Sequence, residues 1–252
     1  MGGQSGLGPP EILYEDAFLI GLNKPAGIPT ANAPRGRASI YTLLRGRAAG
    51  SRANGDATFC GIVSRLDAPV SGVLVVAKTP AAAAGLAHQF RDRAVEKQYL
   101  AVVTGRFPGA LDAWVDWHDQ LQRDDDDPRT AVRPASRTAR DAVPEDVDAD
   151  GPGPGGLAAH VRARVVRRAG EVSLVELVPT TGRRHQLRVQ LAARGCPIVG
   201  DRLYGSRLPF PDGGVALHAR SLAFDHPHDG RRMALEAPVP PGWKTRFPSL
   251  FR

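Results

Sequence analysis

The sequence is poor in cysteine and has no long apolar run. Its only cysteines, Cys60 and Cys196, lie far apart and in no Cys-x-x-Cys spacing. This argues against a disulfide framework or a zinc site and favours a reducing cytoplasm. The longest apolar run, Gly72 to Ala77, is far too short to cross a bilayer. The first ten residues lack the basic and apolar regions of a signal peptide. We therefore expect a cytoplasmic protein without a membrane span.

Several familiar catalytic motifs are also missing. The chain has no Gly-x-Gly-x-x-Gly and no Gly-x-x-x-x-Gly-Lys-Ser/Thr motif, so a nucleotide cofactor is not indicated. It has no Gly-x-Ser-x-Gly elbow of a serine hydrolase. The seven histidines are scattered, and the spacing of His226 and His228 around Pro227 fits either a metal pair or a surface turn. We expect neither a cofactor nor a metal.

Charge is distributed unevenly along the chain. From Asp112 to Asp150 there are 12 acidic and 5 basic residues, whereas the remainder carries 28 basic and 14 acidic residues. So basic a remainder indicates a polyanionic partner, most simply nucleic acid. Arginine greatly outnumbers lysine, and a coding bias toward arginine is the alternative explanation.

Apolar periodicity and turn residues predict an α+β fold with a mixed, largely antiparallel central sheet and flanking helices. Residues 1–10 are expected to be a flexible tail and residues 11–252 a single domain. Two short strands, separated by Glu15-Asp16, are expected within 11–30. A hairpin that turns at Gly170 is expected at 159–178, and single strands are expected at 73–78, 98–104 and 221–224. Helices are expected at 39–47, at 80–90 after the cap Thr79-Pro80, and at 183–194 before the cap Gly195.

The segment from about 119 to 156 has a different composition. It contains four consecutive aspartates (124–127) and ends in a run of glycine and proline (151–156). We interpret it as an insertion within the domain, either disordered or a functional lid. Its acidity could restrain indiscriminate RNA binding by the basic surface, or the segment could be a solvated linker.

Polar side chains gather beside glycine turns at three places. Asp67 follows Arg65, and Lys97 and Tyr99 alternate at the start of an expected strand. The stretch TGRRHQLR (181–188) places a glycine before a helix rich in donors. On a helix from residue 183, Arg184 and Arg188 share a face, and the N-terminus suits phosphate. Each arginine taken alone also fits a solvated helix face.

Five segments, in order, resemble pseudouridine synthases of the RluA type. The segment SRLDAPVSGVLVVAKT (64–79) is similar to the family's HRLDxxTSGxxxxAK, which contains the catalytic aspartate. TTGRRHQLRVQLAARGCPIVGDRLYG (180–205) is similar to TGRxHQIRxHxxxxGxPIxGDxxYG. The remaining matches are ILYEDAFLIGLNKPAGIPT (12–30) with its KPxG turn, VEKQYLAVVTG (95–105) with KxYxAxVxG, and LHARSLAFDHP (217–227).

The resemblance implies an enzyme that isomerises uridine to pseudouridine in rRNA or tRNA, a reaction that needs no metal or cofactor. The oligomeric state is open, and a monomer is the default expectation. Asp67 would act at C1′ of the ribose, either as a nucleophile or as a base on the sugar. Arg188, flanked by Arg65, would favour its ionised form, and Tyr99 would stack on the flipped base. The expected RNA contacts are Arg65, Lys97, Arg183, Arg184, His185 and Gln186. No accessory RNA-binding domain is expected before residue 11.

The sequence departs from the family pattern around the aspartate. Near Asp67, Ser64 stands where histidine is common, Ala68-Pro69 replaces an Arg-Asp or similar pair, and Val70 replaces threonine. In the longest match, Gln190 replaces histidine. Pro69 stiffens the loop and removes a backbone donor. We expect these changes to affect substrate choice. Three alternatives remain: a catalytically silent RNA-binding protein on the same fold, a hydrolase using Asp67 as one of two carboxylates, and a turn-forming role for Asp67.

Overall fold

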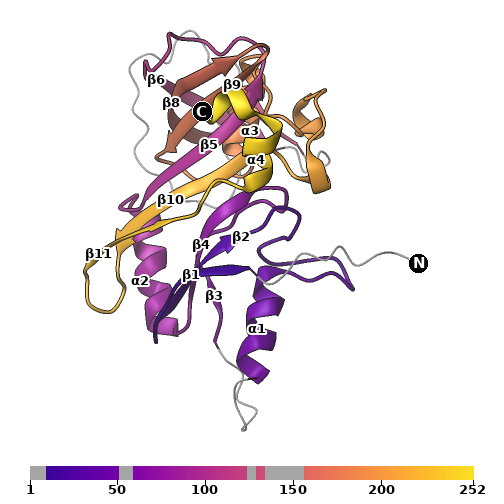
Figure 1. Ribbon diagram of the computed structural model, residues 1–252. Coiled ribbons are helices and arrows are strands. Elements are labelled where there is room, and N and C mark those ends of the chain that lie inside the picture. The colour runs from indigo at the N-terminus through magenta and orange to yellow at the C-terminus, as the bar shows by residue number, and fades with distance from the viewer. Residues whose placement is uncertain (1–9, 51–58, 124–128, 134–155) are drawn as a thin grey trace. The chain divides into compact units, whose positions relative to one another are not determined.

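The computed structural model describes residues 10–50, 59–123, 129–133 and 156–252 (Figure 1). The chain divides into two units. Unit 1 comprises Met1–Leu100 and Phe210–Pro248, and unit 2 comprises Ala101–Pro209 and Ser249–Arg252. Strand β5 (Glu96–Thr104) crosses from one unit into the other. Within the described ranges, no helix has the length and apolar character needed to span a membrane.

The sheet of unit 1 is mixed. Its strand order is β1-β2-β4-β10, with β3 on β4 and β11 on β10. Strand β4 pairs antiparallel with β2 and parallel with β10. All of β4 is buried, which explains the apolar run from Val73 to Ala77. The strands are β1 (Glu11–Glu15), β2 (Leu19–Lys24), β3 (Gly61–Ile62), β4 (Ser71–Ala77), β10 (Leu217–Asp225) and β11 (Arg232–Glu236).

Helix α2 (Pro80–Arg91) covers part of this sheet. Its N-cap is Thr79, whose hydroxyl accepts a 3.1 Å hydrogen bond from the backbone N–H of Ala82. Ala82 and Leu86 lie four residues apart and enter a core with side chains of β2, β4, β10 and β11. The other helical segments assigned wholly to this unit are α1 (Ile40–Gly50), η2 (Pro211–Gly213) and α4 (Pro241–Arg246), and η3 (Pro248–Leu250) crosses the unit boundary.

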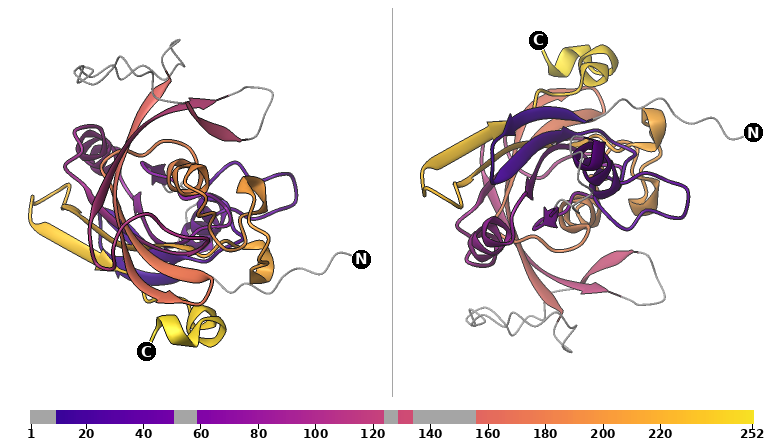
Figure 2. Two further views of the ribbon diagram at one scale, coloured as in Figure 1. Left: turned by 90° about the horizontal axis from the view of Figure 1, so that it is seen from above. Right: turned by 90° about the horizontal axis from the view of Figure 1, so that it is seen from below.

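The sheet of unit 2 is antiparallel, in the order β9-β8-β6-β7. Its strands are β6 (Val115–Arg123), β7 (Thr130–Arg133), β8 (Leu157–Ala169) and β9 (Val172–Pro179). Helix α3 (Gln186–Ala193) lies against the inner face of the curved strands (Figure 2), where Val189 packs on Leu121 and Ala159. The short helix η1 (Arg202–Tyr204) follows.

Most of the predicted elements are confirmed. The strand pair at the start of the chain is split at Asp16, whose carboxylate accepts from the backbone N–H groups of Phe18 and Leu19. The predicted hairpin is β8–β9, and its turn residue Gly170 has a φ of 58°. Of the expected tail, residues 1–10, all but Pro10 lie outside the described part of the chain.

Three expectations need correction. Residues 119–123 and 130–133 of the expected loop are strands, in β6 and β7; residues 124–128 and 134–155 lie outside the described ranges. Helix α3 begins at Gln186, not at residue 183, so Arg184 precedes the helix and does not share a face with Arg188. Arg188 is buried, not part of a solvated face.

Candidate functional site

The loop Leu66–Val70 carries Asp67 and is fixed by backbone contacts. The hydroxyl of Thr30 donates to the carbonyl of Leu66 at 2.8 Å and accepts from the N–H of Leu66 at 3.1 Å. The N–H of Val70 closes a turn on the carbonyl of Asp67 at 3.0 Å. Pro69 also contributes: its carbonyl accepts from the N–H of Val215 at 3.1 Å. The loop therefore holds Asp67 in a defined position, half-buried, at the entrance to β4.

Lys24 also supports this loop. Its ammonium group is fully buried and donates to the carbonyls of Pro25, Ile28 and Ala68 at 2.9, 2.8 and 3.2 Å. Burial lowers the pKa of Lys24 to about 7, and the negative charge of Asp67 raises it. Three carbonyl acceptors match the three N–H donors of an ammonium, which favours the protonated form. Lys24 thus joins the turn after β2 to the residue next to Asp67.

The negative charge of Asp67 also affects Tyr99, which lies on β5. Burial, followed by the negative charge of Asp67, raises the pKa of the Tyr99 phenol to about 12. The side chain is nevertheless partly accessible, as a stacking surface must be. Lys97, two residues earlier on the same strand, has its pKa lowered to about 8 by burial and then by the charge of Arg93. The structure therefore brings Asp67, Tyr99 and Lys24 together in unit 1.

The strand that follows Asp67 is tied closely to β10. Gly72 has a φ of 117°, and a Cβ atom there would lie 2.2 Å from the carbonyl oxygen of Ala219, so only glycine fits. Ser71 and His218 are buried and joined by a 2.9 Å hydrogen bond between Oγ and Nδ1. Burial lowers the pKa of His218 to about 4, so the ring is neutral. Its Nε2 donates to the carbonyl of Ala237 at 3.2 Å, so Nδ1 accepts from Ser71. These contacts fix the base of the Asp67 loop.

Arg188 is buried in unit 2. Its Nε and Nη2 donate to the two carboxylate oxygens of Asp201 at 2.7 and 2.8 Å, which is a bidentate ion pair. The guanidinium carbon lies 5.2 Å from the centre of the Tyr204 ring. The hydroxyl of Tyr204 accepts from the backbone N–H of Thr130 and forms a 2.9 Å hydrogen bond with Nδ1 of His185. These contacts hold the Arg188 side chain rigidly.

The turn before α3 is built by Gln186. Its carbonyl oxygen accepts from the Thr181 hydroxyl at 2.8 Å and from the N–H of Arg183 at 3.0 Å. Its amide nitrogen donates to the carbonyl of His160 at 2.9 Å. His185, with a φ of 53°, adopts the left-handed conformation that starts the helix. Gln186 is buried and its amide is engaged in this turn, so its role here is to shape the turn that carries Arg183 and His185.

The remaining predicted residues lie at or near the surface. Arg65 and Arg184 are exposed, while Arg183 is half-buried and its Nε donates to the carbonyl of Ala158 at 3.2 Å. The ring nitrogens of His226 lie 2.8 Å from a carboxylate oxygen of Asp16 and 3.0 Å from one of Asp229. Among the described residues, no group of three or more histidine, cysteine, aspartate or glutamate side chains is placed to hold a metal ion.

Sequence reasoning gave no role to Lys24, Thr30, Asp201 or Tyr204. Lys24 stands in the KPxG turn, and Asp201 and Tyr204 stand in the GDxxYG part of the longest match. The signal was therefore present in the motifs. Their tasks depend on contacts with Ala68, Leu66 and Arg188, which a single sequence does not reveal.

The chain is similar in sequence to known proteins. Residues 19–193 match the family model described as RNA pseudouridylate synthase. The chain is 37% identical over 253 residues to the ribosomal large subunit pseudouridine synthase D of Xanthomonas campestris pv. campestris, covering 92% of this chain and 66% of that protein. It is 33% identical over 242 residues to the uncharacterized RNA pseudouridine synthase YlyB of Bacillus subtilis, covering 91% and 69%. The chain thus spans about two thirds of the length of these relatives.

Solved structures share the fold. The human RNA pseudouridylate synthase domain containing 4 superposes with a TM-score of 0.73 at 23% identity, over 95% of this chain and 92% of that one. The human RNA pseudouridylate synthase domain containing 1 superposes with a TM-score of 0.65 at 25% identity, over 91% and 83%. These likenesses confirm the expected α+β class with a mixed, largely antiparallel sheet.

Proposed function

The chain belongs to the RNA pseudouridylate synthase family, and from this premise we propose that it isomerises uridines in RNA to pseudouridine. One observation supports Asp67 as the reacting group. Asp67 lies on a loop held by Thr30, Lys24 and Val215. Its negative charge helps to raise the pKa of the Tyr99 phenol. A carboxylate held in this way, beside a partly accessible aromatic ring, suits a reaction at the sugar of a stacked base.

In the proposed reaction, the uracil base stays with its own ribose but changes the atom through which it is attached. The N1–C1′ bond of the uridine breaks, the uracil turns, and a C5–C1′ bond forms. The proton on C5 is released and N1 gains one, so no electrons are exchanged with another molecule. The Asp67 carboxylate acts at C1′ or as a base on the sugar. We propose that Arg188, oriented by Asp201, favours its ionised form.

Tyr99 is proposed to provide a ring surface for the target base. Because its pKa is about 12, the phenol stays protonated through the neutral and mildly alkaline range. We expect Tyr99→Phe, which keeps the ring, to retain activity within about ten-fold, with a pH profile parallel to the wild type between pH 7 and 10. Tyr99→Ala should lose about 1–3 kcal/mol of stacking, or roughly 5- to 150-fold in kcat/KM. Equal losses in both variants would contradict a stacking role.

The RNA is proposed to contact Arg65, Lys97, Arg183, Arg184 and His185. Arg65 and Arg184 are exposed, and the pKa of Lys97, about 8, leaves this side chain largely protonated at neutral pH. Neutralising phosphates with such side chains releases counterions, so affinity should fall steeply with salt concentration. We further propose that the protein acts as a monomer in the cytoplasm and without a metal; Cys60 and Cys196 are both free thiols.

Large-subunit ribosomal RNA is the proposed substrate, because relatives of this chain bear the name ribosomal large subunit pseudouridine synthase. The test uses RNA with tritium at C5 of uridine and counts tritium released to water, in the presence of EDTA. Release from ribosomal RNA but not from tRNA is the expected result. Release from tRNA alone would correct the substrate. Binding of both RNAs without any release would favour a catalytically silent RNA-binding protein.

A further inference from the structure

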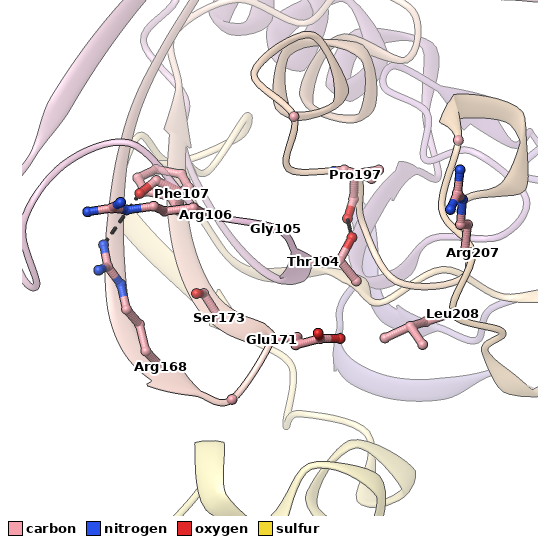
Figure 3. Close-up of a pocket in the computed structure, with 13 residues that line it drawn as sticks. Thr104, Gly105, Arg106, Phe107, Arg168, Glu171, Ser173, Pro197, Arg207 and Leu208 are labelled. Atoms are coloured by element: carbon pink, nitrogen blue, oxygen red, sulfur yellow. Dashed lines mark hydrogen bonds between the residues drawn. The ribbon is translucent and has the colours of Figure 1, made fainter.

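A surface pocket of about 690 Å³ lies within unit 2 (Figure 3). It is bounded by the β8–β9 turn, the loop after β5, and the segments that follow α3 and η1. Three arginines line it, each from a different segment: Arg106, Arg168 and Arg207. All three are exposed, and Glu171 is the only carboxylate among the lining residues. The lining side chains therefore carry a net positive charge.

The arginines are available to a ligand. Within the described part of the chain, Arg106 and Arg207 make no hydrogen bond or ion pair. Arg168 is held in place, because its Nη2 donates to the carbonyls of Gly109 at 2.7 Å and Phe107 at 3.4 Å. Figure 3 shows Arg106 and Arg168 together on one wall and Arg207 on the other. A guanidinium without a carboxylate partner is the side chain best suited to bind phosphate.

Glycines keep the walls of the pocket open. Four of the lining residues are glycines with positive φ: Gly105, Gly170, Gly195 and Gly205. A Cβ atom added at residue 170, 195 or 205 would meet nothing within 4 Å, so these backbone segments border open space. A bulky, extended ligand such as a nucleic-acid backbone can therefore approach the main chain closely.

None of the candidate site residues of unit 2 is among the residues that line the pocket. Ser173 and Glu171 lie where β9 starts, whereas the turn with Arg183 and His185 follows the end of that strand at Pro179. At about 3.3 Å per residue, the length of β9 separates the two ends by roughly 20 Å. The β9 wall of the pocket therefore lies well away from that turn, whereas on the opposite wall Gly205 directly follows Tyr204, which bonds to His185.

We propose that this arginine pocket binds phosphates of the RNA substrate outside the nucleotide that is modified. The inference rests on the proposed function, since the polyanion is the RNA itself. An RNA strand or helix readily spans 20 Å, so one substrate molecule reaches both sites. The pocket adds affinity for RNA phosphates, and Glu171 weakens that affinity by repelling phosphate.

The test measures binding of fluorescein-labelled large-subunit ribosomal RNA by fluorescence anisotropy over a series of salt concentrations. The double variant Arg106→Ala/Arg207→Ala should bind about ten-fold more weakly at ~0.1 M salt, and the slope of log affinity against log salt should fall by about 2. The matched control is Arg37→Ala/Arg91→Ala, which removes the same charge from exposed positions in unit 1. The control should change affinity by less than about two-fold.

Glu171→Gln distinguishes phosphate from another ligand. It should tighten RNA binding by about two- to three-fold, because a repulsive charge is removed. Weaker binding by this variant would overturn the proposal and indicate a ligand that donates to the carboxylate. If wild-type protein releases tritium but the pocket variant binds RNA as tightly as the control variant, the pocket proposal fails alone. If wild-type protein binds RNA and releases no tritium, the proposed function fails instead.

Discussion

Replacing Asp201 with alanine is expected to lower the free energy of unfolding by about 3–5 kcal/mol, because it leaves a buried guanidinium without its carboxylate. The side chains of Arg188 and Asp201 are only 7% and 1% exposed, and two short hydrogen bonds join them. For a chain of this size, each kcal/mol corresponds to about 2–4 °C in Tm. Thermal denaturation followed by circular dichroism should therefore show a fall of about 10 °C.

Asp116→Ala is the matched control for this prediction. Asp116 pairs with Arg162 at 3.6 Å in the same unit, but both side chains are more than half exposed. An exposed pair contributes at most about 1 kcal/mol, so Tm should hardly change. A loss of stability in Asp201→Ala no larger than in this control would contradict the structural importance of the buried pair.

A double variant separates stability from activity. Arg188→Met/Asp201→Leu removes both buried charges and should recover much of the lost stability, since apolar residues often replace a buried ion pair at little cost. Tritium release should nevertheless remain lost, because the proposed partner of Asp67 is gone. Recovery of both stability and activity would show that Arg188 has a structural role only.

Lys24→Met is expected to reduce kcat for tritium release by about 10- to 100-fold, while KM changes by less than about three-fold. Lys24 is a positioning residue: its ammonium donates to the carbonyl of Ala68, next to Asp67, and does not reach solvent. Small displacements of a reacting group are costly because the bound geometry supplies much of the rate enhancement. Lys78→Met is the control, since Lys78 donates to Glu15 and to the carbonyl of Asp16, away from the Asp67 loop.

The pH dependence of stability provides a second readout for Lys24. Its pKa falls from an ordinary value of 10.5 to about 7 in the folded protein. Between these pH values the unfolded chain binds more protons, so the contribution of Lys24 to stability increases as pH rises from 7 toward 10.5. The stability of the wild type relative to Lys24→Met should rise by up to about 1.4 kcal/mol per pH unit in urea denaturation. A relative stability that falls with pH would contradict the lowered pKa.

Local sequence signals predicted most of the elements in unit 1 and the hairpin β8–β9 of unit 2. Thr79-Pro80 starts α2 because a threonine side chain caps the helix and proline fits its first turn. The hairpin β8–β9 was predicted because alternating residues flank a glycine that takes positive φ. Each of these signals lies within a few residues of the structure that it specifies.

Other elements depend on contacts between distant residues. Strand β6 was missed because the inward-facing Asp119 interrupts its apolar alternation with Trp117 and Leu121. In the structure, Asp119 accepts from Gln190 at 2.7 Å and pairs with Arg194 at 3.0 Å, so its burial depends on α3. The start of α3 was placed too early because Gln186 and the left-handed His185 define it through contacts with the preceding turn.

The family resemblance named Asp67, Tyr99 and Arg188 but not the residues that hold them. The supporting contacts join residues that are distant in the chain. Lys24 and Ala68 are 44 positions apart, and Thr30 and Leu66 are 36 apart. Asp201 and Arg188 are 13 apart. Motif spacing does not indicate which backbone carbonyl a buried lysine will meet. These residues stand in the matched motifs, but their supporting contacts follow from the structure alone.

The most direct test of the central claim compares wild-type protein with Asp67→Asn, which keeps the shape of the side chain and removes its charge. Tritium release from ribosomal RNA labelled at C5 of uridine is measured with RNA in excess, and RNA affinity is measured in parallel. We expect release to fall by about 10⁴-fold or more, as for removal of a covalent or general-base carboxylate, while the Kd for RNA stays within about three-fold. Release by Asp67→Asn within ten-fold of the wild type would contradict the account.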